Sequence, residues 1–262
     1  MEPDAVVREF THQSASFNAA PAMRSADTLG RLLDLIPAAA GERWLDAACG
    51  PGLVARGLAP RVGRVQGVDM TPAMVDLATR EAAREGIPNA AFSVGDATAL
   101  GFEPGSFDGA VTRFSLHHIP RPGRVVAELA RVVRPGGAVV IADHVTSEDA
   151  DVAAWHEEIE RLRDPSHWAC LTPARLRTLG ETAGLALERE EMQPLAIDYE
   201  EWIGRGSGGP ASRGLIAAAL AERVPGPDVF RVVDAAEGRR LELRYWLSVW
   251  RAPSLAGGAG GV

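Results

Sequence analysis

The chain has 262 residues, of which 46% are hydrophobic, and a formal net charge of −8. That length and hydrophobic content are enough for one large domain with a sizeable core. The negative charge argues against a general nucleic-acid-binding protein, which needs a basic surface to neutralise phosphates. All 27 cationic residues are arginine, so enzymes that require a lysine, such as Schiff-base and P-loop enzymes, are excluded.

The N-terminal residues lack the basic and then apolar layout of a signal peptide. No apolar run approaches the roughly 20 residues that a helix needs to cross a bilayer. The two cysteines, Cys49 and Cys170, do not suggest a disulfide framework. We therefore expect a cytoplasmic protein without membrane insertion.

In chain order, residues 1–40 are predicted to be helical, because Phe10 and Phe17 share one helix face and leucines follow at helical spacing. Strands and helices then alternate. Strands are predicted at residues 43–46, 65–69, 91–94, 107–112 and 138–143. Helices are predicted from residue 53 and over 72–85 and 122–133, with Thr71 as the N-cap of the second and the run RPGG ending the third. Strands separated by helix-length crossovers indicate a parallel sheet covered by helices on both faces.

The second half of the chain has a different character. An acidic helical segment is expected over 147–170, a helix over 173–183, strands over 185–192 and 240–250, and a flexible Gly-rich connector over 204–212. The insert between the last two strands is long for a minimal fold. An insert of this kind builds either an acceptor pocket or a homodimer contact, and the sequence leaves both open.

The segment WLDAACGPGLVA, residues 44–55, reads as a strand end, a turn of small residues and a helix start. Glycine in such a turn lets the backbone approach a ligand closely. The spacing Gly50-x-Gly52-x-x-Ala55 also fits the dinucleotide fingerprint, and Asp69 lies where a ribose-binding acid belongs. An NAD-dependent oxidoreductase is therefore one alternative.

Three features favour S-adenosylmethionine instead. Asp46, at the strand end, would attract a cationic ligand and repel a pyrophosphate. Pro51 removes a backbone N–H from a loop that a phosphate site would use. Asp96 supplies a second acid one strand beyond Asp69, so that the two can hold the ribose and the adenine amino group of one adenosine.

The runs LDAACGPG, GVDMTPAM, GDATAL, FDGAVTRFSLHH and RVVRPGG follow one another over roughly residues 40–145. In this order they resemble class I S-adenosylmethionine-dependent methyltransferases of the ubiquinone/menaquinone-methyltransferase-like (methyltransferase type 11) family. The resemblance implies an α/β fold with a Rossmann-like, seven-stranded, mostly parallel sheet, helices on both faces, a helical N-terminal cap and lid insertions. One departure is Ala48, which occupies the first glycine position of the loop.

The resemblance also implies a set of cofactor-binding residues: Asp46, Ala48, Cys49, Gly50, Gly52, Asp69, Met70, Asp96, Ala97 and Arg113. Asp69 would take both ribose hydroxyls, with Met70 packed on the adenine. Asp96 and Ala97 would bind the adenine edge. Arg113, after the fourth strand, would lie beside the methionine portion and the sulfonium.

Methyl transfer is an in-line displacement at a sulfonium, so the protein must align the acceptor and, for O or N acceptors, remove a proton. Candidate catalytic residues are His117 and His118 after the fourth strand and His167 in the lid segment, with Asp143-His144 at the end of the fifth strand nearby. In α/β sheets ligands gather at the carboxyl ends of strands, which is where these residues lie. No His/Asp/Glu spacing indicates a metal site, and none is predicted.

The expected organisation is a cap over residues 1–40, a methyltransferase domain over 41–253 with lid or substrate insertions at 147–172 and 197–239, and a flexible tail over 254–262. The expected function is methylation of a small-molecule acceptor at C, O or N, as in quinone-like compounds or other secondary metabolites. The alternative is an enzyme that binds S-adenosylmethionine but catalyses a cyclisation, another pericyclic reaction or a decarboxylation, because fold does not fix function. No nucleic-acid partner is expected.

Overall fold

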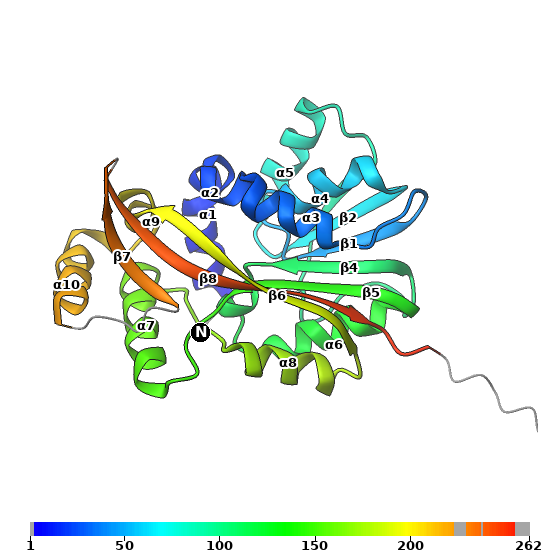
Figure 1. Ribbon diagram of the computed structural model, residues 1–262. Helices are drawn as coiled ribbons and strands as arrows, with labels where there is room; N and C mark the ends of the chain where they lie inside the picture. Colours follow the sequence, from blue (N-terminus) through cyan, green and yellow to red (C-terminus); the bar gives the residue numbers. More distant parts are fainter. Residues whose placement is uncertain (1–2, 223–228, 237, 255–262) are drawn as a thin grey trace, which may run out of the picture.

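A central sheet organises the chain in the computed structural model, which describes residues 3–222, 229–236 and 238–254 (Figure 1). Its strands lie in the order β3-β2-β1-β4-β5-β8-β6, and β7 pairs with β8 outside this path. The strands are β1 Arg43–Ala47, β2 Arg64–Asp69, β3 Ala90–Val94, β4 Phe107–Arg113, β5 Val133–His144, β6 Ala186–Asp198, β7 Phe230–Ala235 and β8 Gly238–Arg251. Strands β1 to β5 are parallel, and β8 is antiparallel to β5, β6 and β7. The predicted mostly parallel, Rossmann-like sheet is confirmed.

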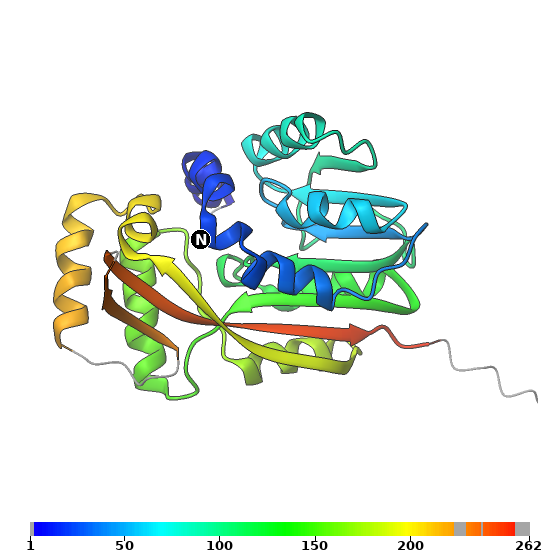
Figure 2. The same cartoon turned by 45° about the horizontal axis from the view of Figure 1, so that its top comes forward.

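Helices cover both faces of the sheet, as Figures 1 and 2 show. The helices α3 Arg31–Leu35, α4 Leu53–Leu58 and α5 Pro72–Arg84 lie on one face, and α6 Pro122–Val132 and α8 Pro173–Thr182 on the other. Side chains alternate between the two cores: Trp44 packs into one and Leu45 into the other, and Val140 likewise lies opposite Ile141. This alternation explains why β5 is apolar without interruption, since both of its faces are buried.

Two local expectations needed correction. The run RPGG, expected to end the third helix, lies inside β5, because the strand begins at Val133, which pairs with Phe107 of β4. Thr71 does occupy the N-cap position of α5, but its side chain makes no capping hydrogen bond. Its backbone N–H donates instead to Asp69 Oδ1 at 2.9 Å.

The N-terminal region is helical, as expected. It consists of α1 Pro3–Ala19, α2 Pro21–Arg24, a π-helical turn over Ala26–Gly30, and α3. Helix α1 contacts both α5 and α9. It therefore lies between α5 on the sheet and the lobe described next, apart from the other layers in Figure 2.

A second lobe, on the left in Figure 1, comprises α7 Ala150–Arg163, α9 Tyr199–Arg205, α10 Gly209–Glu222 and β7. Strand β8 continues through both parts. Its residues 245–251 pair with β5 in the central sheet, whereas residues 238–243 pair with β7 in the lobe. The strand β7 was not predicted from the sequence.

The prediction of a flexible connector over 204–212 was wrong, because α9 ends and α10 begins within it, leaving only residues 206–208 between them. The glycines there serve close packing. A Cβ on Gly206 would lie 2.1 Å from the carbonyl oxygen of Arg163, and one on Gly208 2.1 Å from that of Leu162. The expected flexible tail lies outside the described residues from 255 onward. Among the described helices, none combines the length and apolarity needed to span a bilayer.

Candidate active site

A cavity of about 350 Å³ lies at the carboxyl ends of β1, β2 and β4, and its volume is in the range of small-molecule sites. Val6, Phe10 and Phe17 of α1 form part of its lining, so the helix covers it. The lining includes nine of the ten residues expected to bind the cofactor: Asp46, Ala48, Cys49, Gly50, Asp69, Met70, Asp96, Ala97 and Arg113. Lining residues that were not predicted include Phe114 and Ser115, directly after β4, and residues 119–121, after the turn Leu116–His118. For Phe114 and Ser115, the end of the strand was the available signal.

The loop after β1 is built from left-handed backbone. Ala48 has φ 53°, Gly50 φ 52° and Gly52 φ 75°. A Cβ at Gly50 would meet nothing within 4 Å, so the space there is open toward the cavity. A Cβ at Gly52 would lie 2.7 Å from the Phe92 ring. Gly52 is the one expected cofactor residue outside the lining, and its position requires glycine for packing against β3.

Asp69 joins this loop to the end of β2. Its Oδ2 accepts a hydrogen bond from the Gly50 N–H at 2.8 Å, and its Oδ1 accepts one from the Thr71 N–H. Burial raises the pKa of this carboxyl, and the two backbone donors oppose that rise. The carboxylate is thus held at the cavity by two main-chain N–H groups.

Asp46 ends β1 on the cavity floor and is almost fully buried. Its Oδ2 accepts from the Ala55 N–H of α4 at 3.0 Å. Burial raises its pKa to about 7. A cationic ligand would favour the ionised form of this carboxyl. The position therefore suits an ammonium group.

Arg113 faces the same cavity from the end of β4. Its Nη2 donates to the Met23 carbonyl at 2.9 Å, and its guanidinium carbon lies 4.6 Å from the centre of the Phe114 ring. Burial lowers its pKa to about 10. Its buried Nε has no hydrogen-bond partner among the described residues. An anionic group such as a carboxylate would satisfy this donor.

The other end of the cavity is lined by Met70, Asp96 and Ala97. Asp96 is exposed, and its Oδ1 accepts from the Thr98 N–H at 2.7 Å. Together with Asp69, two carboxylates at successive strand ends face a space flanked by apolar side chains. The residues therefore fit a ligand with an amino-acid portion at one end and a nucleoside at the other.

The three histidines named as catalytic candidates differ in position. His118 lines the cofactor cavity and also a second, smaller cavity of about 60 Å³. His117 lines only the smaller cavity, and His167 lines neither. The His118 ring packs edge-on against Phe10, its Nδ1 lies 3.5 Å from the Ser166 carbonyl, and burial lowers its pKa to about 4.

The smaller cavity adjoins the larger one, since Phe10, Phe17, Phe114 and His118 line both. Trp202, Leu195 and Leu243 make much of the rest apolar. Two arginines also line it. Arg163 is paired with Glu160 at 3.1 Å, whereas the nearest carboxylate to Arg205, that of Glu201, is 3.8 Å away. Burial lowers the pKa of Arg205 to about 10, and its Nε has no hydrogen-bond partner within the described chain.

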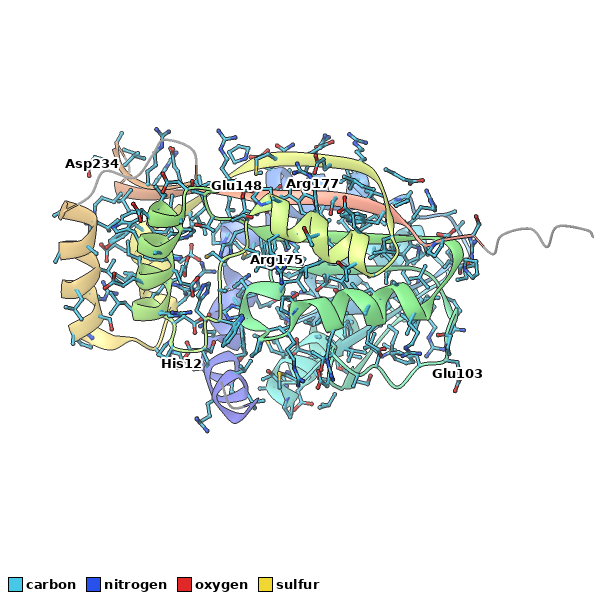
Figure 3. The ribbon with its side chains drawn as sticks, turned by 90° about the horizontal axis from the view of Figure 1, so that it is seen from below. His12, Glu103, Glu148, Arg175, Arg177 and Asp234 are labelled. Atoms are coloured by element: carbon cyan, nitrogen blue, oxygen red, sulfur yellow. The ribbon has the colours of Figure 1, made fainter. Side chains whose placement is uncertain are left out.

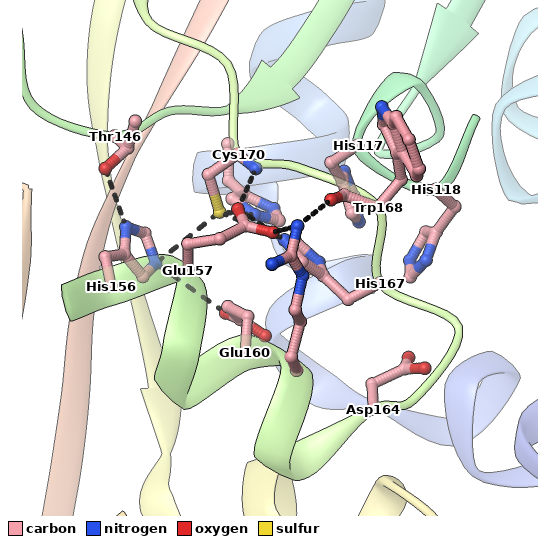
Figure 4. A network of polar contacts seen from close by, with 12 residues as sticks. His117, His118, Thr146, His156, Glu157, Glu160, Asp164, His167, Trp168 and Cys170 are labelled. Carbon is pink, nitrogen blue, oxygen red and sulfur yellow. Dashed lines mark hydrogen bonds and ion pairs between the residues drawn. The ribbon is translucent and has the colours of Figure 1, made fainter. Parts of the chain in front are cut away.

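His117 belongs to a buried group of polar side chains (Figure 4). Its Nδ1 lies 2.6 Å from Asp143 Oδ1. Burial raises the pKa of Asp143 to about 8 and lowers that of His117 well below its usual value. His144 and His167 lie beside this pair and contact Cys170. The sequence spacing did not reveal this group, because its members come from segments far apart in the chain.

Comparison with known proteins identifies the family. A family model described as a methyltransferase domain matches residues 45–141. The uncharacterized methyltransferase YcgJ of Bacillus subtilis is 33% identical over 187 residues, which are 71% of this chain and 74% of that protein. The demethylmenaquinone methyltransferase of Renibacterium salmoninarum is 34% identical over 112 residues, which are 43% of this chain and 45% of that protein.

Solved structures agree with the sequence matches. The crystal structure of YcgJ has a TM-score of 0.80 and 28% identity, covering 87% of this chain and 98% of that one. The [4+2]-cyclase SpnF shares the fold, with a TM-score of 0.61, 23% identity, and coverage of 86% of this chain and 81% of that one. The matches favour the methyltransferase over the NAD-dependent oxidoreductase. The chain belongs to the methyltransferase-domain family and is a class I S-adenosylmethionine-dependent methyltransferase.

Proposed function

We propose that the chain binds S-adenosylmethionine in the larger cavity and methylates a small molecule held in the smaller one. The observation that carries this proposal is that the two cavities share one wall, formed by Phe10, Phe17, Phe114 and His118. One cavity has the glycine loop and the acids at the strand ends, and the other combines aromatic and aliphatic side chains with histidines and two arginines. Such a division places a cofactor and an acceptor next to each other, as an in-line transfer requires.

In this proposal the chain holds the cofactor through charge and shape. Asp69 accepts hydrogen bonds from the ribose hydroxyls, while Asp46 pairs with the ammonium group and Arg113 with the carboxylate. Met70 and Ala97 pack on the adenine, whose amino group donates to Asp96. When bound, the cofactor supplies an electrophilic methyl group on a sulfonium.

The acceptor class follows from the smaller cavity. Its volume of about 60 Å³ admits only a small group of the acceptor, its aromatic and aliphatic walls favour a planar or lipophilic one, and Arg205 provides a buried donor for an anionic one. His118 is neutral at pH 7 because of its lowered pKa. If its Nδ1–H donates to the Ser166 carbonyl, Nε2 is left to accept a proton from an acceptor hydroxyl or amine.

A second candidate function keeps the cofactor site but omits methyl transfer. The fold shared with a [4+2]-cyclase makes this candidate specific, because a bound sulfonium can act as a fixed positive charge. The two functions differ in one product. Methyl transfer releases S-adenosylhomocysteine with every turnover, and a cyclisation or decarboxylation does not.

The test begins with calorimetric titration of the purified chain with S-adenosylmethionine, S-adenosylhomocysteine and NAD(H). We expect binding of the two sulfur nucleotides and none of NAD(H). A panel of aromatic acids and phenols is then incubated with S-adenosylmethionine while S-adenosylhomocysteine is quantified. Formation of one S-adenosylhomocysteine for each acceptor molecule consumed supports methylation. Consumption of the acceptor without formation of S-adenosylhomocysteine supports the second candidate. Absence of binding by both sulfur nucleotides contradicts the proposal.

A further inference from the structure

Five of the six histidines of the chain gather in one buried cluster beside the smaller cavity (Figure 4). They are His117, His118, His144, His156 and His167. The cluster is supplied by the turn after β4, the end of β5, helix α7 and the loop that follows α7. Within it, one ring nitrogen from each of His117, His144 and His167 lies within 4.8 Å of one from each of the other two.

Each of these three rings is held at one nitrogen by a neighbouring side chain. His117 Nδ1 lies 2.6 Å from Asp143 Oδ1, His144 Nε2 lies 3.2 Å from Cys170 Sγ, and His167 Nε2 lies 3.3 Å from Glu157 Oε2. A metal-binding histidine is oriented in this way, with its second nitrogen on a carboxylate or another polar group.

The second nitrogens of these rings differ in their surroundings: His144 Nδ1 lies 3.9 Å from Asp143 Oδ1, beyond hydrogen-bond distance. For His167 this nitrogen, Nδ1, is fully buried and has no partner in the part of the chain that the structure describes. A buried polar atom without a partner costs about 1–3 kcal/mol, so native proteins rarely keep one without a ligand, water or ion. The unpartnered Nδ1 of His167, in a ring that belongs to three imidazoles with ring nitrogens within 4.8 Å of one another, points to an ion.

A competing set of three groups, Glu157, His167 and Cys170, also lies within ligand spacing. The Glu157 Oε2 atom already accepts a hydrogen bond from the Cys170 N–H at 2.8 Å. That set has no residue on a cavity wall, whereas His117 and His144 both line the smaller cavity. The three-histidine set therefore leaves a coordination position that opens to this cavity, where a water or a bound molecule can reach it.

We propose that His117, His144 and His167 bind one divalent transition-metal ion, with Zn²⁺ as the best fit, and that its fourth position opens to the smaller cavity. Three imidazoles and one exchangeable position form the ligand set typical of catalytic zinc. The ion would bind a water or an oxygen of the molecule in that cavity. None of the three histidines lines the larger cavity, although His118, which is next to His117 in the chain, does. The proposed metal site therefore does not depend on methyl transfer.

The test uses the full chain without an affinity tag, stripped with a chelator and titrated with Co²⁺ as a spectroscopic probe. We expect one equivalent to bind, with the visible absorption of four-coordinate Co²⁺ and no thiolate-to-cobalt charge-transfer band. Zn²⁺ should displace it stoichiometrically. Failure of the wild-type chain to bind either ion overturns the proposal.

Variants identify the ligands. His144→Ala and His167→Gln should each abolish the Co²⁺ spectrum, and Asp143→Asn should weaken binding about 10- to 100-fold, because it holds His117. The matched control is His12→Ala, since His12 is exposed on α1 and outside the cluster (Figure 3). Calorimetric binding of S-adenosylhomocysteine reports whether each variant is folded.

Cys170→Ser separates the two candidate sets. It should leave binding of Co²⁺ nearly unchanged, because the hydroxyl can still contact His144. Loss of binding in this variant, together with a charge-transfer band in the wild type, would overturn the three-histidine assignment.

Discussion

The cofactor cavity and the histidine cluster adjoin each other but are built in different ways. The carboxylates of the cavity are held by backbone donors: Asp69 by the N–H groups of Gly50 and Thr71, and Asp96 by that of Thr98. The cluster is held by side chains far apart in sequence, as in the pair His117 and Asp143, which are 26 residues apart. Backbone-held groups are local and independent, whereas a network of buried side chains is mutually dependent.

The largest expected effect is on the backbone-held side. Asp69→Ala removes the charged acceptor of two ribose hydroxyls, which at about 1.5–2 kcal/mol each lowers cofactor affinity by about 100- to 1,000-fold. Calorimetric titration with S-adenosylhomocysteine measures this loss. Asp76→Ala, an exposed change on α5, is the control and should leave the affinity unchanged. An unaltered affinity in Asp69→Ala would show that the ribose lies elsewhere.

The next largest effect tests whether the side chains of the histidine cluster stabilise one another. His117→Ala and Asp143→Ala should each lower the free energy of unfolding by about 1–3 kcal/mol, because each leaves a buried partner unsatisfied. The double variant should lose clearly less than the sum, with a coupling of about 1 kcal/mol or more. Urea denaturation measures all three. Additive losses would show that the pair at 2.6 Å contributes no mutual stabilisation.

A pH dependence distinguishes Asp46 from the rest of the cavity. Its pKa is about 7 in the empty protein, and a cationic ammonium binds the ionised form. Cofactor affinity should therefore fall by up to about tenfold per pH unit below pH 7 and level off above it. Stability of the empty protein has the opposite sign, because a raised carboxyl pKa makes unfolding easier as the pH rises from about 4 to 7. Calorimetry across this range tests the prediction, and Asp46→Asn should remove the dependence.

The smallest effect concerns the loop. Ala48 adopts φ 53°, which costs an L-residue about 1–2 kcal/mol and costs glycine nothing. The greater conformational freedom of glycine in the unfolded chain offsets part of this gain. Ala48→Gly should therefore raise the free energy of unfolding by about 1 kcal/mol or less. Ala47→Gly, in the buried end of β1, should lower it. A destabilised Ala48→Gly would show that the methyl group makes a contact that outweighs the backbone strain.

The same contrast explains what the sequence could predict. Strands β1 to β4 and the glycine loop are specified by residues adjacent in the chain, and nine of the ten expected cofactor residues line one cavity. The exception, Gly52, does not line the cavity, and a Cβ on it would lie 2.7 Å from the Phe92 ring. The motif predicts that a glycine stands at this position, and the packing explains why the position requires one.

The lobe was predicted less well because its contacts are long-range. The glycines 206 and 208 suggested flexibility by composition, yet each packs closely on the end of α7. The pairing of β7 with β8 depends on a hairpin whose partner strand also serves the central sheet. His156 and Cys170, whose spacing suggested no site, join the cluster only when α7 packs beside β5.

The continuity of β8 has a mechanical consequence. One unbroken ladder joins the central sheet to the lobe, so the two cannot hinge apart without breaking strand pairs. Helix α1 is joined to the lobe through side chains such as Gln13, whose Nε2 donates to Asp164. Hydrogen exchange should therefore show α1 opening before β8. We therefore expect the proposed cofactor and product to pass under α1, because Val6, Phe10 and Phe17 of this helix line the cavity.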